Sequence, residues 1–100
     1  MRDIDLAFIR LHILHHASEE EVYGVGLVEE LTRHGYHLSF GTLYPLLSSM
    51  VRIGLLTFEA RTVNRKQRKY YRITPSGLKE LKEVKAKIRE LHEEIIEGKP

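Results

Sequence analysis

The chain has 100 residues, of which 42% are hydrophobic and 30% are charged, and it contains no cysteine. This length suits one domain, which we place over residues 1–100, and the lack of cysteine excludes disulfides and thiolate metal sites. Charges interrupt every apolar stretch well before about twenty residues, and the acidic start does not resemble a secretory signal, so we expect no membrane span and a cytoplasmic protein.

The positive charge of the chain is concentrated in one short segment. The net charge is only +2. Residues 55–75, however, carry six basic side chains and one acidic one, a local net charge of +5, whereas residues 1–38 carry three basic and seven acidic ones, a net charge of −4. A segment this basic indicates a polyanionic partner more strongly than the net charge does.

Residues 4–17 are predicted to form the first helix. Helical periodicity gives it two apolar stripes, one of Ile4, Phe8, Leu11 and His15 and the other of Leu6, Ile9 and Ile13. One stripe is enough to face the core of the domain, so the other indicates a partner. A second copy of the chain is the simplest candidate.

Two further helices with a short turn between them follow. Ser18 and Glu21 have the spacing of a capping box, which predicts a helix from Ser18 to about Arg33 that ends at a left-handed Gly35. Ser39 is then expected to cap a third helix of about fourteen residues, which Gly54 ends. Its apolar face consists of Leu43, Leu46, Leu47, Met50, Val51 and Ile53. Two helices joined by a short turn containing glycine predict a helix-turn-helix.

A β-hairpin is predicted directly after these helices. Residues 55–62 alternate between apolar and polar side chains, and residues 70–74 are rich in aromatic and β-branched ones. The intervening residues 63–69 form a basic tip. This is the position of the wing in a winged helix-turn-helix.

The last predicted helix begins with Thr74 as its cap and Pro75 at its first position. Its apolar residues recur at spacings of three and four: Leu81, Val84, Ile88, Leu91 and Ile95. So short a seam is not stable alone in water, and it must pack on the first helix, on a partner, or on both. We therefore assign these five residues, with Ile4, Phe8 and Leu11, to a homodimer interface. The expected fold is mainly α-helical with a small β-hairpin: a winged helix-turn-helix over residues 1–75, followed by a dimerisation helix over residues 76–97.

The first turns of the third helix hold the candidate DNA-reading residues Ser39, Gly41, Thr42 and Tyr44. A helix that enters the major groove presents its first residues to base edges and phosphates. The spacing alone fits equally well a capped helix with incidental hydroxyls. These turns contain no Arg, Lys, Asn or Gln, so we expect sparse base contacts and a larger share for phosphate contacts and DNA shape.

The hairpin supplies the other candidate DNA contacts: Arg61, Arg65, Lys66, Arg68 and Lys69. Such side chains can neutralise phosphates or enter a minor groove. They could instead merely keep an exposed hairpin soluble. Their position after a helix-turn-helix favours contact with double-stranded DNA.

Six histidines raise the question of a metal site. His12 and His16 have the i, i+4 spacing of a metal-binding pair, but the sequence shows no obvious third ligand. We therefore expect these two on a helix surface or at a dimer seam, and His34 and His37 near backbone or DNA phosphate, and we predict no metal and no cofactor. No pattern typical of an enzyme is present. The alternatives left open are a histidine-based metal-responsive regulator and a winged-helix module that binds an acidic protein.

Two runs of the sequence resemble the PadR family of transcriptional regulators. They are residues 38–47, read with residues 54–56, and residues 69–77, and with Tyr23, Gly24 and Gly35 the resemblance extends from residue 4 to about residue 85. It implies DNA contact through the third helix and the wing, with Ser39, Thr42 and Tyr44 among the contacts, and dimerisation through the first and last helices. It also implies repression, which a small molecule relieves in some members.

The chain departs from the family pattern after Gly24, where Val25 stands in place of the usual tyrosine. A single helix after the wing makes it look like the short form of the family. This leaves no separate effector domain, so a small-molecule effector, if there is one, is expected at the dimer interface.

Overall fold

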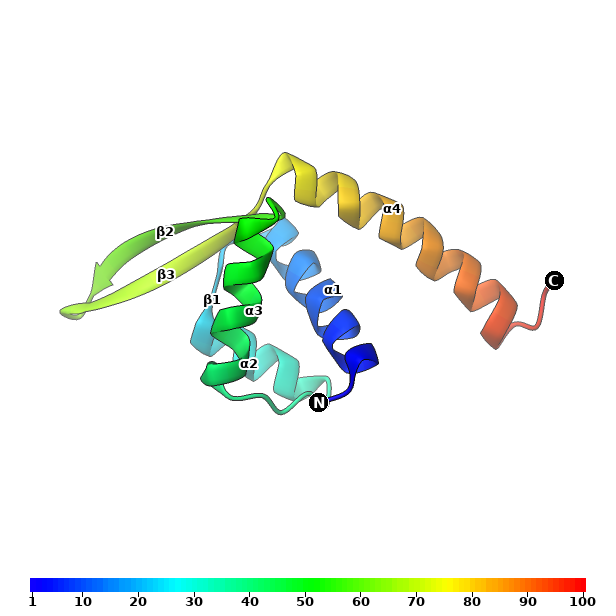
Figure 1. The fold of residues 1–100 in the computed structure, drawn as a ribbon, viewed down its shortest axis with the longest axis horizontal. Helices are drawn as coiled ribbons and strands as arrows, with labels where there is room; N and C mark the ends of the chain where they lie inside the picture. The colour runs from blue at the N-terminus through cyan, green and yellow to red at the C-terminus, as the bar shows by residue number, and fades with distance from the viewer.

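The computed structural model describes residues 1–100 as four long helices, one π-helical turn and a three-stranded sheet (Figure 1). In chain order the elements are α1 (Asp3–Glu19), β1 (Val22–Tyr23), α2 (Gly24–Arg33), α3 (Phe40–Arg52), β2 (Leu56–Val63), β3 (Lys66–Ile73), α4 (Pro75–Leu91) and the turn η1 (His92–Ile96). The sheet is antiparallel with the order β1-β3-β2. This is the mainly helical winged helix-turn-helix that the sequence predicts.

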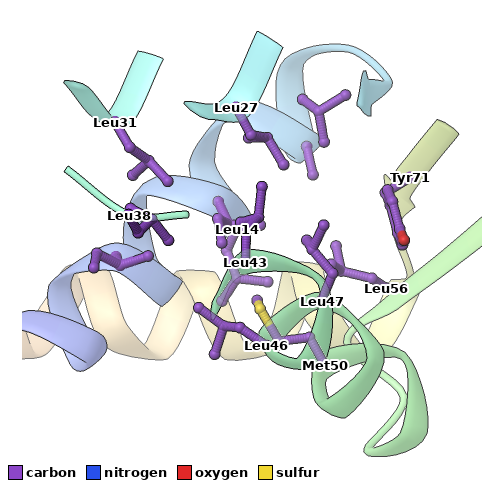
Figure 2. Close-up of a cluster of buried hydrophobic side chains, with 14 of the residues drawn as sticks. Leu14, Leu27, Leu31, Leu38, Leu43, Leu46, Leu47, Met50, Leu56 and Tyr71 are labelled. Atoms are coloured by element: carbon purple, nitrogen blue, oxygen red, sulfur yellow. The ribbon is translucent and has the colours of Figure 1, made fainter. Parts of the chain in front are cut away.

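The core lies where α1, α2 and α3 meet the base of the sheet (Figure 2). It consists of apolar side chains from every element except η1: Ile9, Ile13, Leu14, Ala17, Val22, Leu27, Leu31, Leu38, Leu43, Leu46, Leu47, Met50, Leu56, Tyr71 and Leu81. The second stripe of the first helix, with Ile9 and Ile13, is the one that faces this core. Ile53, which the sequence assigned to the buried face of α3, is 64% exposed because α3 ends before it.

The predicted helix start at Ser18 is wrong. Helix α1 continues to Glu19, and the Ser18 hydroxyl donates a hydrogen bond of 2.6 Å to the carbonyl of His15 within α1. The chain then forms the short strand β1, in which Val22 pairs with Tyr71 of β3, and α2 begins only at Gly24. Glu21 therefore caps no helix and instead lies beside the sheet.

Local end signals fix both helices of the helix-turn-helix. Gly35 adopts a φ of +87°, and the amides of Gly35 and Tyr36 donate to the carbonyls of Thr32 and Leu31, which is the Schellman arrangement. The hydroxyl of Ser39 accepts a hydrogen bond of 3.2 Å from the Thr42 amide and so caps α3 as predicted. These signals set the relative positions of α2 and α3.

Strands β2 and β3 form a hairpin that projects from the body of the protein (Figure 1). The strands are longer than the sequence suggested: the register runs from Leu56 paired with Ile73 to Val63 paired with Lys66, and the turn consists of Asn64 and Arg65 alone. Most residues of the predicted basic tip therefore lie within strands, on defined faces of the wing.

Helix α4 is joined to the body only through its first turns. Thr74 caps it by accepting a hydrogen bond of 3.0 Å from the Gly77 amide, and Gly77 and Leu81 are its only buried residues. Beyond Leu81 the helix extends away from the rest of the chain (Figure 1). None of the helices combines the length and the apolar character that crossing a bilayer requires.

Candidate nucleic-acid interface

The N-terminus of α3 presents two hydroxyl groups to solvent. The Oγ atoms of Ser39 and Thr42 lie 3.4 Å apart, and both residues are exposed. Gly41 is exposed beside them, and a methyl group added there would meet only the Ser39 hydroxyl, at an ordinary 3.6 Å. Nothing inside the chain therefore requires glycine at position 41, and the surface beside it is open.

Tyr44 is held in place by its neighbours on two helices. Its ring stacks on Phe40 with centroids 5.8 Å apart, and its hydroxyl lies over Gly24, where an added methyl group would overlap it. The side chain is still 41% exposed. Tyr44 is therefore oriented by packing while much of its surface stays available to a partner.

The wing carries its basic side chains on both faces. Strand alternation and register place Arg61, Lys66 and Arg68 on the face that also holds Tyr70, and Lys69 on the opposite face with Phe58 and Tyr71. Three of these cations rest on aromatic rings: Arg61 on Tyr70 at 4.4 Å, Arg68 on Tyr23 at 4.7 Å and Lys69 on Phe58 at 4.8 Å. Such contacts orient the cations without neutralising them.

The tip of the wing places a cation where the backbone favours glycine. Asn64 and Arg65 adopt φ values of +52° and +65°, the left-handed conformation of both central residues in a type I′ hairpin turn. Asparagine tolerates this conformation, but the second position favours glycine. The chain has an exposed arginine there instead.

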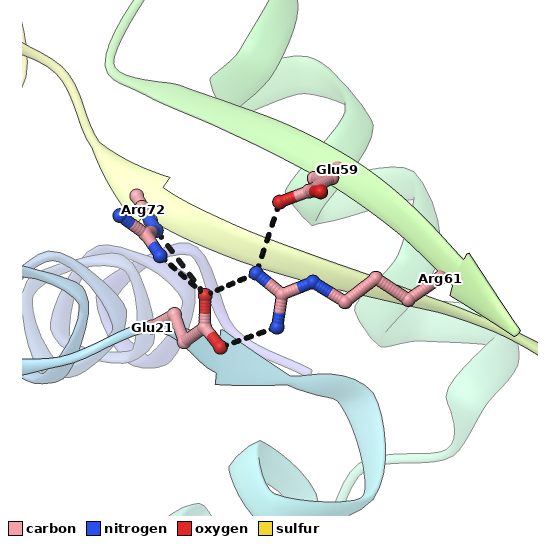
Figure 3. A network of polar contacts seen from close by, with 4 residues as sticks. All are labelled: Glu21, Glu59, Arg61 and Arg72. Atoms are coloured by element: carbon pink, nitrogen blue, oxygen red, sulfur yellow. Dashed lines mark hydrogen bonds and ion pairs between the residues drawn. The ribbon is translucent and has the colours of Figure 1, made fainter. Parts of the chain in front are cut away.

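Arg61, unlike the other candidate basic residues of the wing, is held in ion pairs within the chain. Its guanidinium donates hydrogen bonds of 2.6 and 2.8 Å to the two carboxylate oxygens of Glu21 and a third of 2.9 Å to Glu59 (Figure 3). Arg72 adds a bond of 2.9 Å to Glu21. This network sets Arg61 apart from the other candidate contacts, because its half-buried guanidinium is already paired with two carboxylates. Arg65, Lys66, Arg68 and Lys69 form no ion pair in the chain.

The pKa values of several groups near this network are shifted from their usual range. Hydrogen bonds from Arg61 first and Arg72 second lower the pKa of Glu21 from 4.5 to about 2. The hydrogen bond to Glu21 in turn raises the pKa of Arg61. Burial, and then the nearby Tyr44, raises the pKa of Tyr71 at the base of the wing. Glu21 therefore stays ionised and the Tyr71 hydroxyl protonated at neutral pH.

A cleft brings the two predicted DNA-contacting regions together. It has a volume of about 600 Å³ and lies between the wing, the start of α2 and the middle of α3. Tyr44 lines it from α3, and Lys66, Arg68 and Lys69 line it from the wing. Ser39, Gly41 and Thr42 lie at the exposed start of α3, outside its lining. Of the candidate contacts on α3, Tyr44 therefore shares this cleft with the basic residues of the wing.

The cleft also contains residues that the sequence reasoning missed. Ser48 lies one turn after Tyr44 on α3, Asn64 and Gln67 come from the wing, and Tyr23 comes from β1. Because residues four apart lie on the same side of a helix, the sequence could have identified Ser48 as a neighbour of Tyr44. Asn64 and Gln67 supply amide groups that α3 lacks, and recognising them requires the register of the hairpin.

The residues assigned to dimerisation differ in accessibility. Ile4, Phe8, Ile88, Leu91 and Ile95 are between 47% and 70% exposed, although all five are large and apolar. Leu11 and Val84 are half-buried. Leu81 is only 6% exposed because it packs into the core of its own chain, so its assignment to the dimer interface is corrected.

The histidines of α1 have a neighbour that the sequence did not reveal. His34, which follows α2, stacks on His12 with ring centroids 4.3 Å apart. Burial first, and the neighbouring histidines second, lower the pKa of His12. A third histidine that is not obvious from the sequence thus lies beside His12 and His16.

A helix-turn-helix followed directly by a basic wing defines a winged-helix protein, and the comparisons place it among transcriptional regulators. The model of the transcriptional regulator PadR-like family matches residues 13–83, and the chain belongs to this family. PadR-like regulators are DNA-binding proteins and not enzymes.

Individual relatives agree with this family. A protein named transcriptional regulator Rv3488, from Mycobacterium tuberculosis, is 47% identical over 98% of this chain and 92% of its own length. The crystal structure of a PadR-like transcriptional regulator from Bacillus cereus matches with 33% identity and a TM-score of 0.80, covering 91% of this chain and 90% of that one. That of a PadR family regulator from Eggerthella lenta matches with 35% identity and a TM-score of 0.78, covering 94% and 87%.

Proposed function

We propose that this PadR-like regulator acts in the cytoplasm as a homodimeric repressor that binds a two-fold-related sequence in double-stranded DNA. The observation that carries the proposal is the surface shared by α3 and the wing. Exposed hydroxyls at the N-terminus of α3 lie beside a cleft lined by Tyr44 and by cations that have no acidic partner. This combination suits the bases and phosphates of one stretch of DNA.

The wing supplies most of the affinity in this proposal. Arg65, Lys66, Arg68 and Lys69 are oriented by strand register, aromatic contacts and the hairpin turn. Each contact with a phosphate releases condensed counterions, so affinity falls steeply as the salt concentration rises. These contacts are independent of sequence and set the position of α3 on the duplex.

The start of α3 supplies the sequence preference. Helix N-termini attract phosphates, and the exposed Ser39 and Thr42 side chains lie together at this end of α3. Gly41 allows the DNA backbone to come close, and Tyr44 contacts the bases or sugars at the floor of the groove. Asn64 and Gln67 on the wing extend the set of groups that form hydrogen bonds.

The apolar faces of α1 and α4 support the dimer. Ile88 and Leu91 are each 48% exposed on a helix that has no buried residue after Leu81, and Ile4 and Phe8 are exposed on α1. A short isolated helix is only marginally stable in water, so a second copy that covers this face would stabilise it. Two copies related by a two-fold axis place two reading surfaces on one face of DNA, about 34 Å apart. Occupancy of a promoter by such a dimer is enough to block transcription. An effector bound at the dimer interface stays a prediction.

The test is selection of bound duplexes from a randomised DNA pool, followed by affinity measurements on the selected sequence over a range of salt. We expect an inverted repeat with half-sites about one helical turn apart and a steep salt dependence. Thr42→Val and Tyr44→Phe should change the preferred sequence, whereas Ser76→Ala, an exposed change at the start of α4, should not. Equal affinity for all duplexes would contradict a sequence-specific repressor. No affinity for any duplex would favour the alternative, a winged-helix module that binds an acidic protein.

A further inference from the structure

Three histidines from two helices converge at one corner of the domain. His12 and His16 lie one turn apart on α1, and His34 follows the last residue of α2. One ring nitrogen from each lies within 4.8 Å of one from each of the other two. Neutral imidazole nitrogens are good ligands for borderline transition metals, and three that converge from separate elements form a ligand set that no single helix provides.

A carboxylate lies beside two of these three histidines. Glu30 Oε1 lies 3.3 Å from Nε2 of His16 and 3.2 Å from Nε2 of His34. Metal–ligand distances of about 2.0–2.1 Å place neighbouring ligands of a tetrahedral zinc ion roughly 3.3–3.4 Å apart. Two pairs of potential ligand atoms thus already have the separation that a bound ion needs, and the three histidine nitrogens, which lie within 4.8 Å of one another, would move closer together around the ion.

The surroundings of the cluster suit a metal site. Arg33 pairs with the other oxygen of Glu30, which fixes the carboxylate and leaves Oε1 directed at the histidines. Side-chain exposures of 26% for His16, 42% for His34 and 24% for Glu30 leave a path from solvent. Tyr36 lies against His12 with ring centroids 5.7 Å apart and limits how far that ring can turn away.

We propose that His12, His16, His34 and Glu30 form a binding site for a divalent transition-metal ion, with Zn²⁺ the ion best matched to three imidazoles and one carboxylate. The ion would join α1 directly to the C-terminal end of α2. Because α1 carries the exposed apolar face and α2 is the first helix of the helix-turn-helix, occupancy would couple the two. This coupling rests on the proposed function, whereas the site itself does not.

The experiment is calorimetric titration of the full chain, without an affinity tag, with ZnCl₂, compared across single variants. We expect one ion per chain, and His16→Gln and His34→Gln should each weaken binding by at least about tenfold. His37→Gln, an exposed histidine outside the cluster, should bind like the wild type. Thermal unfolding provides a second readout: zinc should raise the Tm of the wild type and of His37→Gln, but much less that of the other two.

His15→Gln is the matched control for an alternative. His15, His16 and Glu19 form a second, more exposed group on α1 alone. Loss of zinc binding in His15→Gln with retention in His34→Gln would overturn the proposed ligand set. The absence of heat at micromolar zinc, together with an unchanged Tm, would overturn the site altogether. Circular dichroism of each variant without metal establishes that it is folded, so that weakened binding reports on the ligands.

The DNA readout separates the two proposals. If zinc binds and changes the affinity for the selected duplex in the wild type but not in His34→Gln, the coupling is supported. Zinc binding with unchanged DNA affinity would refute the coupling and leave the site intact. Zinc binding by a chain that binds no duplex in either state would refute the proposed function alone.

Discussion

Glu21 and Arg61 are forty positions apart in the sequence, and their side chains meet through two hydrogen bonds of 2.6 and 2.8 Å. Glu21 precedes β1 and Arg61 lies in β2, with β3 between these two strands in the sheet. Arg72 of β3 binds the same carboxylate (Figure 3). One carboxylate therefore links the segment that leads into α2 with both strands of the wing.

Loss of this carboxylate should destabilise the protein in a pH-dependent manner. The pKa of Glu21 is lowered from 4.5 to about 2, so its stabilising effect is fully present above 4.5 and is lost as the pH falls towards about 2. Glu21→Gln should therefore lower the free energy of unfolding near neutral pH, and its difference from the wild type should shrink below pH 4.5 and vanish only as the pH falls through about 2. Urea unfolding at several pH values measures this. Glu20→Gln, an exposed neighbour without an ion pair, is the control, and a difference that does not vary with pH would contradict the assignment.

Gly77→Ala should destabilise the fold although alanine favours helices. A methyl group at position 77 would overlap the carbonyl oxygen of Leu55 and lie 2.6 Å from Ile73 Cγ1, so the start of α4 would have to move away from the wing. Overpacking of this kind costs about 1–3 kcal/mol. Chemical denaturation should show this loss, and Ser76→Ala, one residue earlier and exposed, should not. Equal stability of the two variants would mean that the junction between α4 and the sheet is looser than described.

Arg65→Gly should separate the charge of the wing tip from its backbone conformation. Glycine relieves the left-handed strain at φ +65°, so the variant should be as stable as the wild type or more stable. Its affinity for all duplexes should fall, and the slope of log affinity against log salt should decrease in magnitude by about 1. Arg89→Gln removes an equal charge from α4 and should leave the slope unchanged. An unaltered slope in Arg65→Gly would show that the tip does not contact a phosphate.

Ile88→Lys should dissociate the proposed dimer without unfolding the chain. The side chain is 48% exposed in the isolated chain and contributes nothing to the core, so a lysine there interferes only with a partner. Analytical ultracentrifugation should show a monomer whose circular dichroism retains the winged helix. Ala86→Lys adds the same charge two residues earlier, on the opposite side of α4, and should remain dimeric. If both variants assemble like the wild type, α4 does not form the interface.

The sequence predicted those features that short-range signals encode. Ser39, Thr74 and Gly35 act on amides and carbonyls within a few residues, and the structure confirms all three. Ser18 carries the same kind of signal but fails, because pairing of Val22 with Tyr71 draws the following residues into the sheet. A partner about fifty positions away cannot be identified from a capping pattern.

Long-range contacts also explain what the site prediction missed. In the sequence Arg61 looks like its basic neighbours, and only the fold shows that it pairs with Glu21. Likewise, Leu81 looks like one member of an exposed apolar seam, and only the fold shows that it is buried in the core. The meeting of His34 with His12 and His16 depends on how the C-terminal end of α2 lies against α1. In each case the missing information is the tertiary neighbour, not the local structure.

The detachment of α4 beyond Leu81 has a mechanical consequence for a two-fold assembly. From Leu81 to Leu91 the helix rises by about 15 Å, so it acts as a lever arm between the DNA-reading surface and the partner. A small change in the angle at which two such arms cross would be amplified into a change in the distance between the two wings. Whether a DNA sequence is read would then depend on the span between its half-sites, and an agent that tilts the arms could switch the protein off without touching the DNA-contacting residues.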